Sequence, residues 1–330
     1  MTSSFDVAGL GNAIVDVIAP VDDAFLLQHK IAKGVMTLID DFRAAQLYEA
    51  LVMPQEIGGG SAANTMAGLA SLGGNGLFVG KVKRDRLGMS FSRSMKDIGV
   101  TFDVPFAEDG PPTACCMIAV TPDGHRSMNT YLGASRELKP SDIDETQIAS
   151  ASIVYVEGYL WDLPDAKAAI KKAIAAAKKA GRKIAFTLSD PFCVSRWRDE
   201  FRVLLKSDID ILFANEEEAK ALYEVEEFDS VLQAFHNWHG IAALTRSAKG
   251  CVVAKGHEVH VIDAAPVAQV LDTTGAGDQY AAAFLYGLTH GKHLADCGRL
   301  GSLAAAEVIS HYGARPETSL KGLAKIAGLI

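Results

Sequence analysis

The amino-acid sequence predicts an α/β fold: a doubly wound, mostly parallel sheet flanked by helices, with a small β-sheet lid. Two observations predict it. In the second half of the 330 residues, short apolar runs alternate with helical segments, as in the βαβ units of a parallel sheet covered on both faces. In the first half, strand-like runs are joined by turns with little helix between them. No low-complexity linker separates the halves, so residues 1–330 are expected to form one domain.

The second half supplies the large sheet, element by element. "SIVYVEG" (Ser152–Gly158) is a strand, and the Ala/Lys-rich segment after it is a helix that ends at Gly181, because glycine readily takes the left-handed conformation that closes a helix. "KIAFTLSD" (Lys183–Asp190) is the next strand, and "IDILFANEEEAKALY" is a strand that runs into a helix. The remaining elements are a strand with a β-hairpin in "IAALTRSAKGCVVAKGHEVHVID" and two closing helices, Gln279–His290 and Ala295–Ser310.

The first half supplies the small sheet. "NAIVDVIAPV" (Asn12–Val21) and the stretch Thr113–Gly133 have the pattern of strands, and "TPDG" inside the second stretch is a type I turn signal. The edges of such a sheet can pair with a second copy or serve only in a lid, so a monomer and a homodimer both stay open. The expected lid sheet comprises residues 12–57 and 101–133, and the large α/β core comprises residues 58–100 and 134–330.

The composition disfavours several classes of protein. The formal net charge is −8 with no block of like charges, so the basic patch that nucleic-acid binding requires is missing. The five cysteines include no CxxC pair, which argues against a zinc site or a disulfide framework and for a reducing compartment. The N-terminal sequence lacks the pattern of a signal peptide, and no apolar run approaches the ~18–20 residues of a membrane span. A cytoplasmic protein without nucleic-acid or membrane partners is therefore expected.

A glycine-rich stretch near the N-terminus can be compared with the fingerprint of dinucleotide-binding sites. "GLGNAIVD" (Gly9–Asp16) begins like the dinucleotide fingerprint, but its sixth position is Ile14 and the following residues alternate like a strand. The fingerprint needs a small residue there and a helix after it. The sequence also contains no GxxxxGK[ST] loop. Both a dinucleotide-dependent dehydrogenase and a Walker-type nucleotide site are therefore disfavoured.

"GGGSAANTMAGLASLGG" (Gly58–Gly74) places three glycines before an Ala-rich helix. One interpretation is structural: a tight turn before a helix that packs closely on the sheet. The other is functional: a polar ligand meets bare backbone at Gly59 and Gly60, and Asn64 reaches it from the first helical turn. The stretch alone does not decide between the two.

"DTTGAGDQYAAAFLYGL" (Asp272–Leu288) carries the clearest chemistry. Gly275, Ala276 and Gly277 can turn successive N–H groups into one concavity at a helix start, where unpaired amides and the helix dipole favour an anion. Asp278 taken alone can be a helix-stabilising acid. Beside an anion site, however, a carboxylate suits phosphoryl transfer to a hydroxyl, because the amides stabilise phosphate charge and the carboxylate accepts the hydroxyl proton.

Together these two glycine-rich stretches resemble the N- and C-terminal signatures of the ribokinase-like (PfkB) family of carbohydrate and nucleoside kinases, in the right order and separation. The likeness runs from "FDVAGLGNAIVD" to about Pro316. Within the family, "GHRSMNTYLGAS", "FTLSDPFCVSRW" and "DIDILFANEEEAKAL" are most similar to the adenosine kinase branch. The resemblance implies a ribokinase-like fold and a transferase of purine salvage that uses ATP with Mg²⁺.

The resemblance also implies the roles of residues on the acceptor side. Asp278 matches the catalytic base, and Gly275 to Gly277 match the anion hole. Asp16 matches a carboxylate that holds ribose hydroxyls, and a carboxylate can accept from two neighbouring hydroxyls at once. An aromatic residue often stands at or beside Leu160 in adenosine kinases, and here Tyr159 or Trp161 would serve. The expected acceptor contacts are Asn12, Asp16, Gly59, Gly60 and Asn64 for the ribose, and Leu132, Ala134, Tyr159 and Leu160 for the base.

The nucleotide and metal positions follow from the same resemblance. "NEEE" (Asn215–Glu218) supplies the NxxE motif, whose Asn215 and Glu218 act on Mg²⁺ and phosphate through waters; dipole complementation is the other interpretation of this acidic helix start. Arg126 matches a basic residue that meets the transferring phosphate. "TRSAKG" (Thr245–Gly250) resembles the nucleotide loop TxGxxG, with Ser247 in place of its first glycine. Thr274 completes the nucleotide contacts, and a monovalent cation such as K⁺ is expected near Asp272 and Thr274.

The expected reaction is transfer of the γ-phosphate of ATP to the 5′-hydroxyl of adenosine or a related purine nucleoside. The pocket segment "EGYLWDLP" departs from the adenosine kinase pattern, which leaves inosine, guanosine or a sugar open as acceptor. The first alternative is a sugar kinase of the same family that acts on ribose, fructose or a sugar acid. The second is a non-catalytic nucleoside-binding protein on this fold, against which the intact Asp278 argues.

Overall fold

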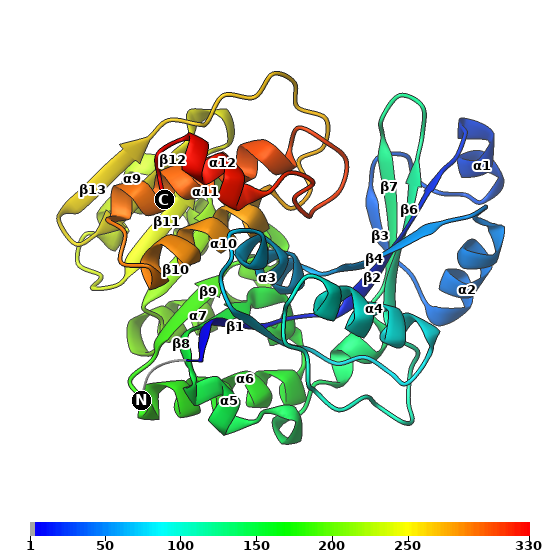
Figure 1. The fold of residues 1–330 in the computed structure, drawn as a ribbon, viewed down its shortest axis with the longest axis horizontal. Helices are drawn as coiled ribbons and strands as arrows, with labels where there is room; N and C mark the ends of the chain where they lie inside the picture. Colours follow the sequence, from blue (N-terminus) through cyan, green and yellow to red (C-terminus); the bar gives the residue numbers. More distant parts are fainter. Residues whose placement is uncertain (1–3) are drawn as a thin grey trace.

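The computed structural model describes residues 4–330 and arranges them around two β-sheets (Figure 1). The large sheet has the strand order β13-β12-β11-β10-β9-β8-β1-β5. Neighbours from β5 to β11 run parallel, and β12 and β13 continue the sheet antiparallel. Its strands are β1 (Phe5–Leu10), β5 (Gly76–Val79), β8 (Ala151–Glu157), β9 (Lys183–Thr187), β10 (Ile211–Asn215), β11 (Ile241–Thr245), β12 (Cys251–Lys255) and β13 (Glu258–Ile262).

The predicted α/β fold class is confirmed, and most predicted elements are found close to their expected limits. Strand β8 lies within one residue of the predicted Ser152–Gly158, and the predicted hairpin is the β12–β13 pair. The strand predicted over Lys183–Asp190 ends earlier, at Thr187. It ends there because Ser189 takes a left-handed φ of 74° and Asp190 caps the next helix, accepting a hydrogen bond from the N–H of Cys193.

Helices cover both faces of the large sheet and form a separate apolar core on each (Figure 1). Met66, Phe284 and Leu300 belong to one core, and Trp161 and Phe186 belong to the other. The helices of the first face are α3 (Ser61–Ser71), α10 (Ala276–Thr289), α11 (Leu294–Val308) and α12 (Leu320–Ile326). Those of the second are α5 (Glu145–Ala149), α6 (Pro164–Lys179), α7 (Pro191–Ser207), α8 (Glu216–Tyr223) and α9 (Phe228–Phe235).

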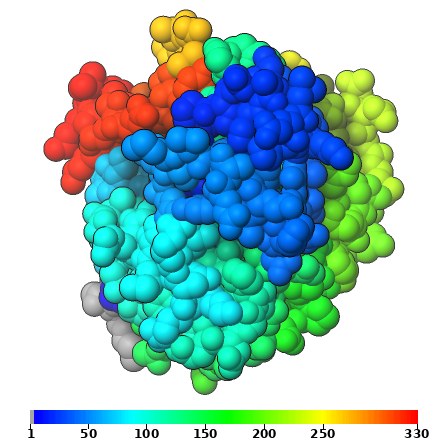
Figure 2. Space-filling model, turned by 90° about the vertical axis from the view of Figure 1, so that its right-hand side faces the viewer, coloured from blue at the N-terminus to red at the C-terminus, as the bar shows by residue number. Residues whose placement is uncertain are grey.

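The small sheet stands beside the large one, with its strands in the order β3-β7-β6-β2-β4. Figure 2 looks onto its outer side, where segments from the N-terminal part of the chain, in shades of blue, lie over the surface. The turn predicted at "TPDG" joins β6 to β7, with the N–H of Gly124 donating to the carbonyl of Thr121 at 2.8 Å. The strands are β2 (Ile14–Pro20), β3 (Met36–Leu38), β4 (Gln55–Gly59), β6 (Ala114–Val120) and β7 (Arg126–Tyr131).

The expectation of little helix among these strands is wrong. The helices α1 (Asp23–Gln28) and α2 (Asp41–Ala50) follow β2 and β3, and α4 (Arg86–Asp97) packs on β2 and β4. Both α1 and α2 are short, and each begins at an aspartate cap: Asp22 and Asp40 accept hydrogen bonds of 2.8 Å from backbone N–H groups three residues on. Such caps satisfy unpaired amides at a helix start, so this signal was present in the sequence.

The chain passes from the large sheet to the small one at Gly11 and Asn12, between β1 and β2. Space is tight here: a Cβ on Gly11 would lie 2.3 Å from Oε2 of Glu157. A glycine therefore lets the crossing strand pass over the carboxyl end of β8. In Figure 1, α3 and α10 start beside this crossing, between the two sheets. The junction of the sheets is where polar groups from distant parts of the chain meet.

Candidate active site

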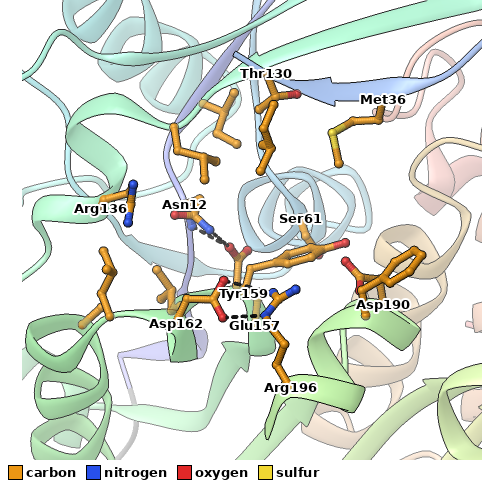
Figure 3. A pocket seen from close by; sticks show the side chains of 17 residues that line it. Asn12, Met36, Ser61, Thr130, Arg136, Glu157, Tyr159, Asp162, Asp190 and Arg196 are labelled. Atoms are coloured by element: carbon orange, nitrogen blue, oxygen red, sulfur yellow. Dashed lines mark hydrogen bonds and ion pairs between the residues drawn. The ribbon is translucent and has the colours of Figure 1, made fainter. Parts of the chain in front are cut away.

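A cavity of about 500 Å³ lies between the small sheet and the carboxyl ends of the large sheet's strands (Figure 3). Asn12, just after β1, and Glu157, at the end of β8, form its polar floor. Met36 and Leu38 of β3 form an apolar wall on the side of the small sheet. Parallel α/β sheets bind ligands at this edge, so the cavity is the natural place for a substrate.

Asp278 lies in the first turn of α10, next to Ser61, which lines this cavity. Its carboxylate accepts a hydrogen bond of 2.6 Å from the Oγ of Ser61 and one of 3.3 Å from the Nδ2 of Asn64. Burial raises the pKa of Asp278 to about 6, against the lowering effect of these two donors. The carboxylate is therefore mostly ionised at neutral pH and can accept a proton, as a general base must.

The anion nest predicted beside Asp278 has the backbone conformation of a helix start. Gly275 precedes α10 with φ of 79°, a left-handed conformation that favours glycine, and a Cβ there would lie 2.7 Å from Cα of Ala314. Gly277 is exposed, and a Cβ there would have nothing within 4 Å. No side chain caps the start of α10. The N–H of Ala276 donates to the backbone oxygen of Thr273 at 3.3 Å, but the exposed position of Gly277 leaves its amide open to a ligand, which is how helix starts bind phosphate.

Asn12 is fixed by Glu157, a residue that the sequence analysis did not select. Oε1 of Glu157 accepts hydrogen bonds of 2.7 Å from both the backbone N and the Nδ2 of Asn12. Its Oε2 accepts one of 2.9 Å from the N of Ala62, the second residue of α3. Burial raises the pKa of Glu157 to about 7, despite these three donors. A charged residue at the end of a largely apolar strand was the signal in the sequence.

Asp16 projects from β2 towards the same region. Its carboxylate lies against bare backbone, because a Cβ on Gly59 would come within 2.5 Å of Oδ2. No side chain or amide among residues 4–330 donates a hydrogen bond to it, so its oxygens can accept from a ligand's hydroxyls. Burial raises the pKa of Asp16 to about 6, whereas the charges of Arg126 and Arg315 lower it.

Gly60 shows why the stretch Gly58–Gly74 needs glycine for structural reasons. It precedes α3 with φ of 97°, and a Cβ there would lie 2.1 Å from the backbone oxygen of Asn12. Asn64 is buried one turn further, with its amide between Asp278 and Arg315. The structural interpretation therefore holds at Gly60, whereas the ligand contacts of Gly59, Gly60 and Asn64 stay predictions.

A second hollow, of about 90 Å³, is lined by Asp278 and Gly277. Ser61 lines both this hollow and the larger cavity. Asn215, Glu218 and Thr245, which the resemblance assigns to nucleotide and metal, also line the small hollow. The predicted base thus shares a hollow with predicted nucleotide residues, and its hydrogen-bond partner Ser61 connects it to the larger cavity.

Asn215 and Glu218 form a capping box at the start of α8. The N–H of Glu218 donates to Oδ1 of Asn215 at 2.8 Å, and Glu218 accepts from the N and Nδ2 of Asn215 at 3.0 and 2.6 Å. Burial raises the pKa of Glu218 to about 7, and the nearby charges of Asp190 and Asp278 raise it further. The capping box gives this motif a structural role at the start of α8. Its role at Mg²⁺ and phosphate stays a prediction, in keeping with the position of Glu218 and Asp278 on one hollow.

These carboxylates fit a magnesium ion that is held mainly by phosphates and water. No group of three or more His, Cys, Asp or Glu within residues 4–330 is arranged to hold a metal by protein ligands alone. Mg²⁺ in kinases is commonly bound by one or two carboxylates together with substrate phosphates. The mutual repulsion of Glu218, Asp190 and Asp278 is what a divalent cation would relieve. Glu218 and Asn215 are the residues placed to hold its waters.

Arg126 does not stand free on the lid. Its side chain is buried, and its guanidinium forms an ion pair with Asp272. The same carboxylate accepts hydrogen bonds from the N and Oγ1 of Thr274, at 3.0 and 2.6 Å, and from the N of Gly313, at 3.0 Å. Burial would raise the pKa of Asp272, but these donors hold it below its ordinary value. A monovalent cation at Asp272 would have to share this carboxylate with Arg126.

The nucleotide loop has the backbone that its glycine pattern requires. Ser247, which stands where the family commonly has glycine, takes φ of 51°, a left-handed conformation that is uncommon for serine. Gly250 takes φ of 77°, and a Cβ there would lie 2.0 Å from the backbone oxygen of Ile262. The serine therefore keeps the loop shape at some cost in strain, and its side chain is exposed.

The residues predicted for the base wall divide into two groups. Tyr159, Leu160 and Leu132 line the cavity, and the ring of Tyr159 crosses it in Figure 3. The hydroxyl of Tyr159 donates to the backbone oxygen of Ser189 at 3.3 Å. Ala134 is fully buried in the core, and Trp161 packs edge-on against Phe186. Neither belongs to the cavity wall, because both side chains turn towards the helices behind it.

Several cavity residues were not selected from the sequence. Ser61 stood in a quoted motif, but its contact with Asp278 crosses 217 positions and has no local signature. Arg196 pairs with Asp162 through two hydrogen bonds of 3.1 and 3.0 Å, and Arg136 lies at the rim nearby (Figure 3). These residues belong to loops and helix starts whose meeting depends on the whole fold.

Within residues 4–330, no helix has the length and apolarity that crossing a membrane requires. The five cysteines are all buried and unpaired. Burial raises the pKa of the Cys116 thiol to about 12, and the charge of Asp16 acts in the same direction, so this thiol next to the site is not a reactive nucleophile.

Comparison with known proteins places this geometry in a family. Residues 52–320 match the model of the pfkB family carbohydrate kinases. This match spans most of the chain, so the protein belongs to that family. It is accordingly a phosphotransferase with an alcohol group as acceptor.

Two solved structures resemble it along the whole chain. A probable sugar kinase from Rhizobium etli is 48% identical, with a TM-score of 0.91 and 100% of both chains covered. The adenosine kinase of Sinorhizobium meliloti is 49% identical, with a TM-score of 0.90, covering 98% of this chain and 100% of that one. Among curated relatives, adenosine kinase 1 of Arabidopsis thaliana is 26% identical over 94% of this chain and 96% of its own.

Proposed function

We propose that the protein transfers the γ-phosphate of ATP to the 5′-hydroxyl of adenosine or a related purine nucleoside. The observation that carries the proposal is the position of Ser61, which lines both hollows and donates a hydrogen bond to Asp278 in the smaller one. An acceptor in the larger cavity can bring its hydroxyl to the carboxylate from one side. The triphosphate can approach from the other side, along the open start of α10.

The polar floor suits a ribose, and the wall suits a flat base. Asn12, Asn64 and Asp16 offer amide and carboxylate groups to neighbouring hydroxyls. Tyr159 offers an aromatic ring that is 37% exposed, and Met36 and Leu38 face the cavity from β3. Aromatic and apolar surfaces of this kind hold a purine by stacking and by burial of its faces. The 49% identity to an adenosine kinase supports the same acceptor.

The nucleotide side supplies charge stabilisation. Amides of residues 275–277 and the guanidinium of Arg126, once released from Asp272, would meet the phosphoryl oxygens. Mg²⁺, when bound with ATP, neutralises charge on the phosphates. Asn215 and Glu218 would hold its waters, and Thr245 and Ser247 would contact the nucleotide. Movement of the small sheet towards the large one would exclude water from the transfer.

A sugar is the second candidate acceptor. The cavity rim carries Arg136, Arg196 and Asp162, polar groups that a purely apolar base pocket does not need. The 48% identity to a probable sugar kinase supports this alternative equally. It predicts turnover of ribose, fructose or a sugar acid while nucleosides stay inert.

An ADP-release assay with ATP and Mg²⁺ tests the proposal across adenosine, inosine, guanosine, cytidine, ribose and fructose. We expect turnover with adenosine well above the other acceptors. Turnover with a sugar alone would keep Asp278 and the nest but overturn the nucleoside pocket. A Tyr159→Ala variant separates the two further, because loss of the ring should raise the KM for a nucleoside and leave the KM for a sugar nearly unchanged.

A further inference from the structure

Arg315 lies behind the acceptor side of the site, on the segment that follows α11. Its Nη1 donates to the Oγ of Ser94 at 3.0 Å, and its Nε donates to Oδ1 of Asn64 at 3.4 Å. Its Nη2 lies 3.5 Å from the sulfur of Met95. A Cβ on Gly58 would come within 2.9 Å of the same nitrogen. The guanidinium is therefore packed against the end of β4, directly behind Gly59.

All of these hydrogen-bond partners are neutral. Burial lowers the pKa of Arg315 to about 10, and the charge that opposes this effect is that of Asp16. The guanidinium remains charged at neutral pH. A cation in such a place is costly unless a nearby anion compensates it. Asp16, with no hydrogen-bond donor among residues 4–330, is the matching anion that lacks a partner.

We propose that Arg315 is a positioning residue for the acceptor: its charge compensates the Asp16 carboxylate across Gly59, and its guanidinium fixes the amide of Asn64. It touches neither substrate nor phosphate, and acts through the two side chains that receive the hydroxyls. The inference rests on the proposed function only in naming those hydroxyls as the ligand of Asp16.

The segment that carries Arg315 is held to both helix starts, so the guanidinium is placed precisely enough to act. Nε2 of Gln279 donates to the backbone oxygen of Asn64 at 3.0 Å and to that of Ala314 at 2.8 Å. Ala314 also fills the space behind Gly275. One glutamine thus ties α3, α10 and the Arg315 segment together, and a site held by such supports keeps its geometry during binding.

Three charged groups act on Asp16, each from a different segment of the chain. Arg126 of β7 and Arg315 lower its pKa, and Asp278 of α10 raises it; Cys116, its neighbour on β6, is a neutral thiol. The charge of Arg126 is shared with Asp272, its ion-pair partner. Loss of Arg315 therefore leaves Asp16 with less compensation and moves its pKa above about 6. Asp16 would then carry a proton at a pH where the wild-type residue is ionised.

The direct test follows Asp16 itself and needs no substrate. Aspartate carboxyls are labelled with ¹³C, the Asp16 signal is assigned by its loss in Asp16→Asn, and its titration is compared in wild type and Arg315→Gln. We expect an upward shift of about one pH unit, on the scale of a removed opposite charge. Arg315→Lys, which keeps the charge, should restore most of it. Arg299→Gln, an exposed arginine of α11, is the matched control and should leave the titration unchanged.

The kinetic arm uses the acceptor with the highest turnover in the panel, whatever it is. At pH 6 we expect Arg315→Gln to raise the acceptor KM about fivefold, the change in ionised Asp16 for a shift of one pKa unit, with kcat changed less than about threefold. The KM difference should shrink at pH 8.5. An unshifted Asp16 titration, or a loss confined to kcat, would overturn the inference. Adenosine proving inert would overturn the proposed acceptor and leave the Asp16 titration fully interpretable.

A stability arm covers the case in which Arg315→Gln folds poorly. Asp16→Asn/Arg315→Gln removes both charges, so neither is left without its counterpart. We expect the double variant to melt higher than Arg315→Gln alone, because a compensating pair is coupled in a double-mutant cycle. Additive losses of Tm would show that the two side chains are independent and would overturn the inference.

Discussion

Two helices in this molecule begin alike and serve different purposes. Helices α3 and α10 pack on each other, each follows a glycine with positive φ, and neither has a side-chain cap. At α3 the space is closed by protein, because a Cβ on Gly60 would lie 2.1 Å from the backbone oxygen of Asn12. At α10 the preceding glycine, Gly275, is closed in the same way by Ala314, but a Cβ on Gly277, two residues on, would meet nothing within 4 Å. Glycine thus allows close packing of the backbone at both helix starts, and only α10 also has an exposed glycine where a ligand has room to approach.

The largest effect is expected from the carboxylate that the open helix start presents. Asp278→Asn keeps the fold of α10 and the nest but removes the proton acceptor. We expect kcat to fall by about 10²–10⁴, the usual scale for a general base, with little change in Tm. Steady-state kinetics at saturating ATP and acceptor measure it. Asp296→Asn, an acid in the first turn of α11, is the matched control and should be active; near wild-type turnover in Asp278→Asn would sink the assignment.

A substitution at the closed start of α3 should lower the stability of the protein. Gly60→Ala combines an unfavourable φ of 97° with a clash against backbone that cannot rotate away. We expect a loss of about 2–4 kcal/mol in the free energy of unfolding, measured by urea denaturation. Gly99→Ala isolates the backbone effect, since Gly99 has φ of 80° and free space around its Cβ; it should lose about 1 kcal/mol. Equal losses in the two variants would show that the contact with Asn12 is unimportant.

A substitution at the exposed glycine of α10 should instead lower activity and leave the stability of the protein intact. Gly277→Ala adds a methyl group where the protein has room, and alanine favours a helix over glycine by about 1 kcal/mol. We therefore expect Tm to stay level or rise. The methyl group would nevertheless stand where phosphate approaches the first amides, so kcat/KM for ATP should fall by about 10–10². A stable variant with unchanged ATP kinetics would show that the phosphates lie elsewhere.

Features formed by neighbouring residues could be predicted from the sequence, whereas contacts between distant parts of the chain could not. The nest and Asp278 are local, since three small residues, a carboxylate and a helix follow one another along the chain. The contacts of Asn12 with Glu157 and of Arg315 with Asn64 span 145 and 251 positions, so no local pattern contains them. The α/β class followed from alternation of strands and helices, but α1 and α2 are too short for a clear period. Their aspartate caps were the available signal.

The smallest effect concerns the contact that joins the two helix starts, Ser61 of α3 to Asp278 of α10. Burial raises the pKa of Asp278 to about 6, and the hydrogen bond from the serine hydroxyl keeps that pKa from rising further. Ser61→Ala removes that donor, so the pKa should rise by about half to one unit. Asp278 is then protonated, and unable to act as base, up to a higher pH. The acidic limb of kcat should move upward by the same amount.

A pH profile of kcat separates this effect from damage to the fold. At pH 6.5 Ser61→Ala should be about 1.5–3-fold slower than wild type, which follows from the shift in ionised fraction. At pH 8.5 both enzymes have an ionised Asp278 and should converge. Ser195→Ala, which removes an exposed hydroxyl of α7, is the control and should follow wild type throughout. A loss that is equal at every pH would mean that Ser61 orients Asp278 or the phosphate and leaves the pKa of Asp278 unchanged.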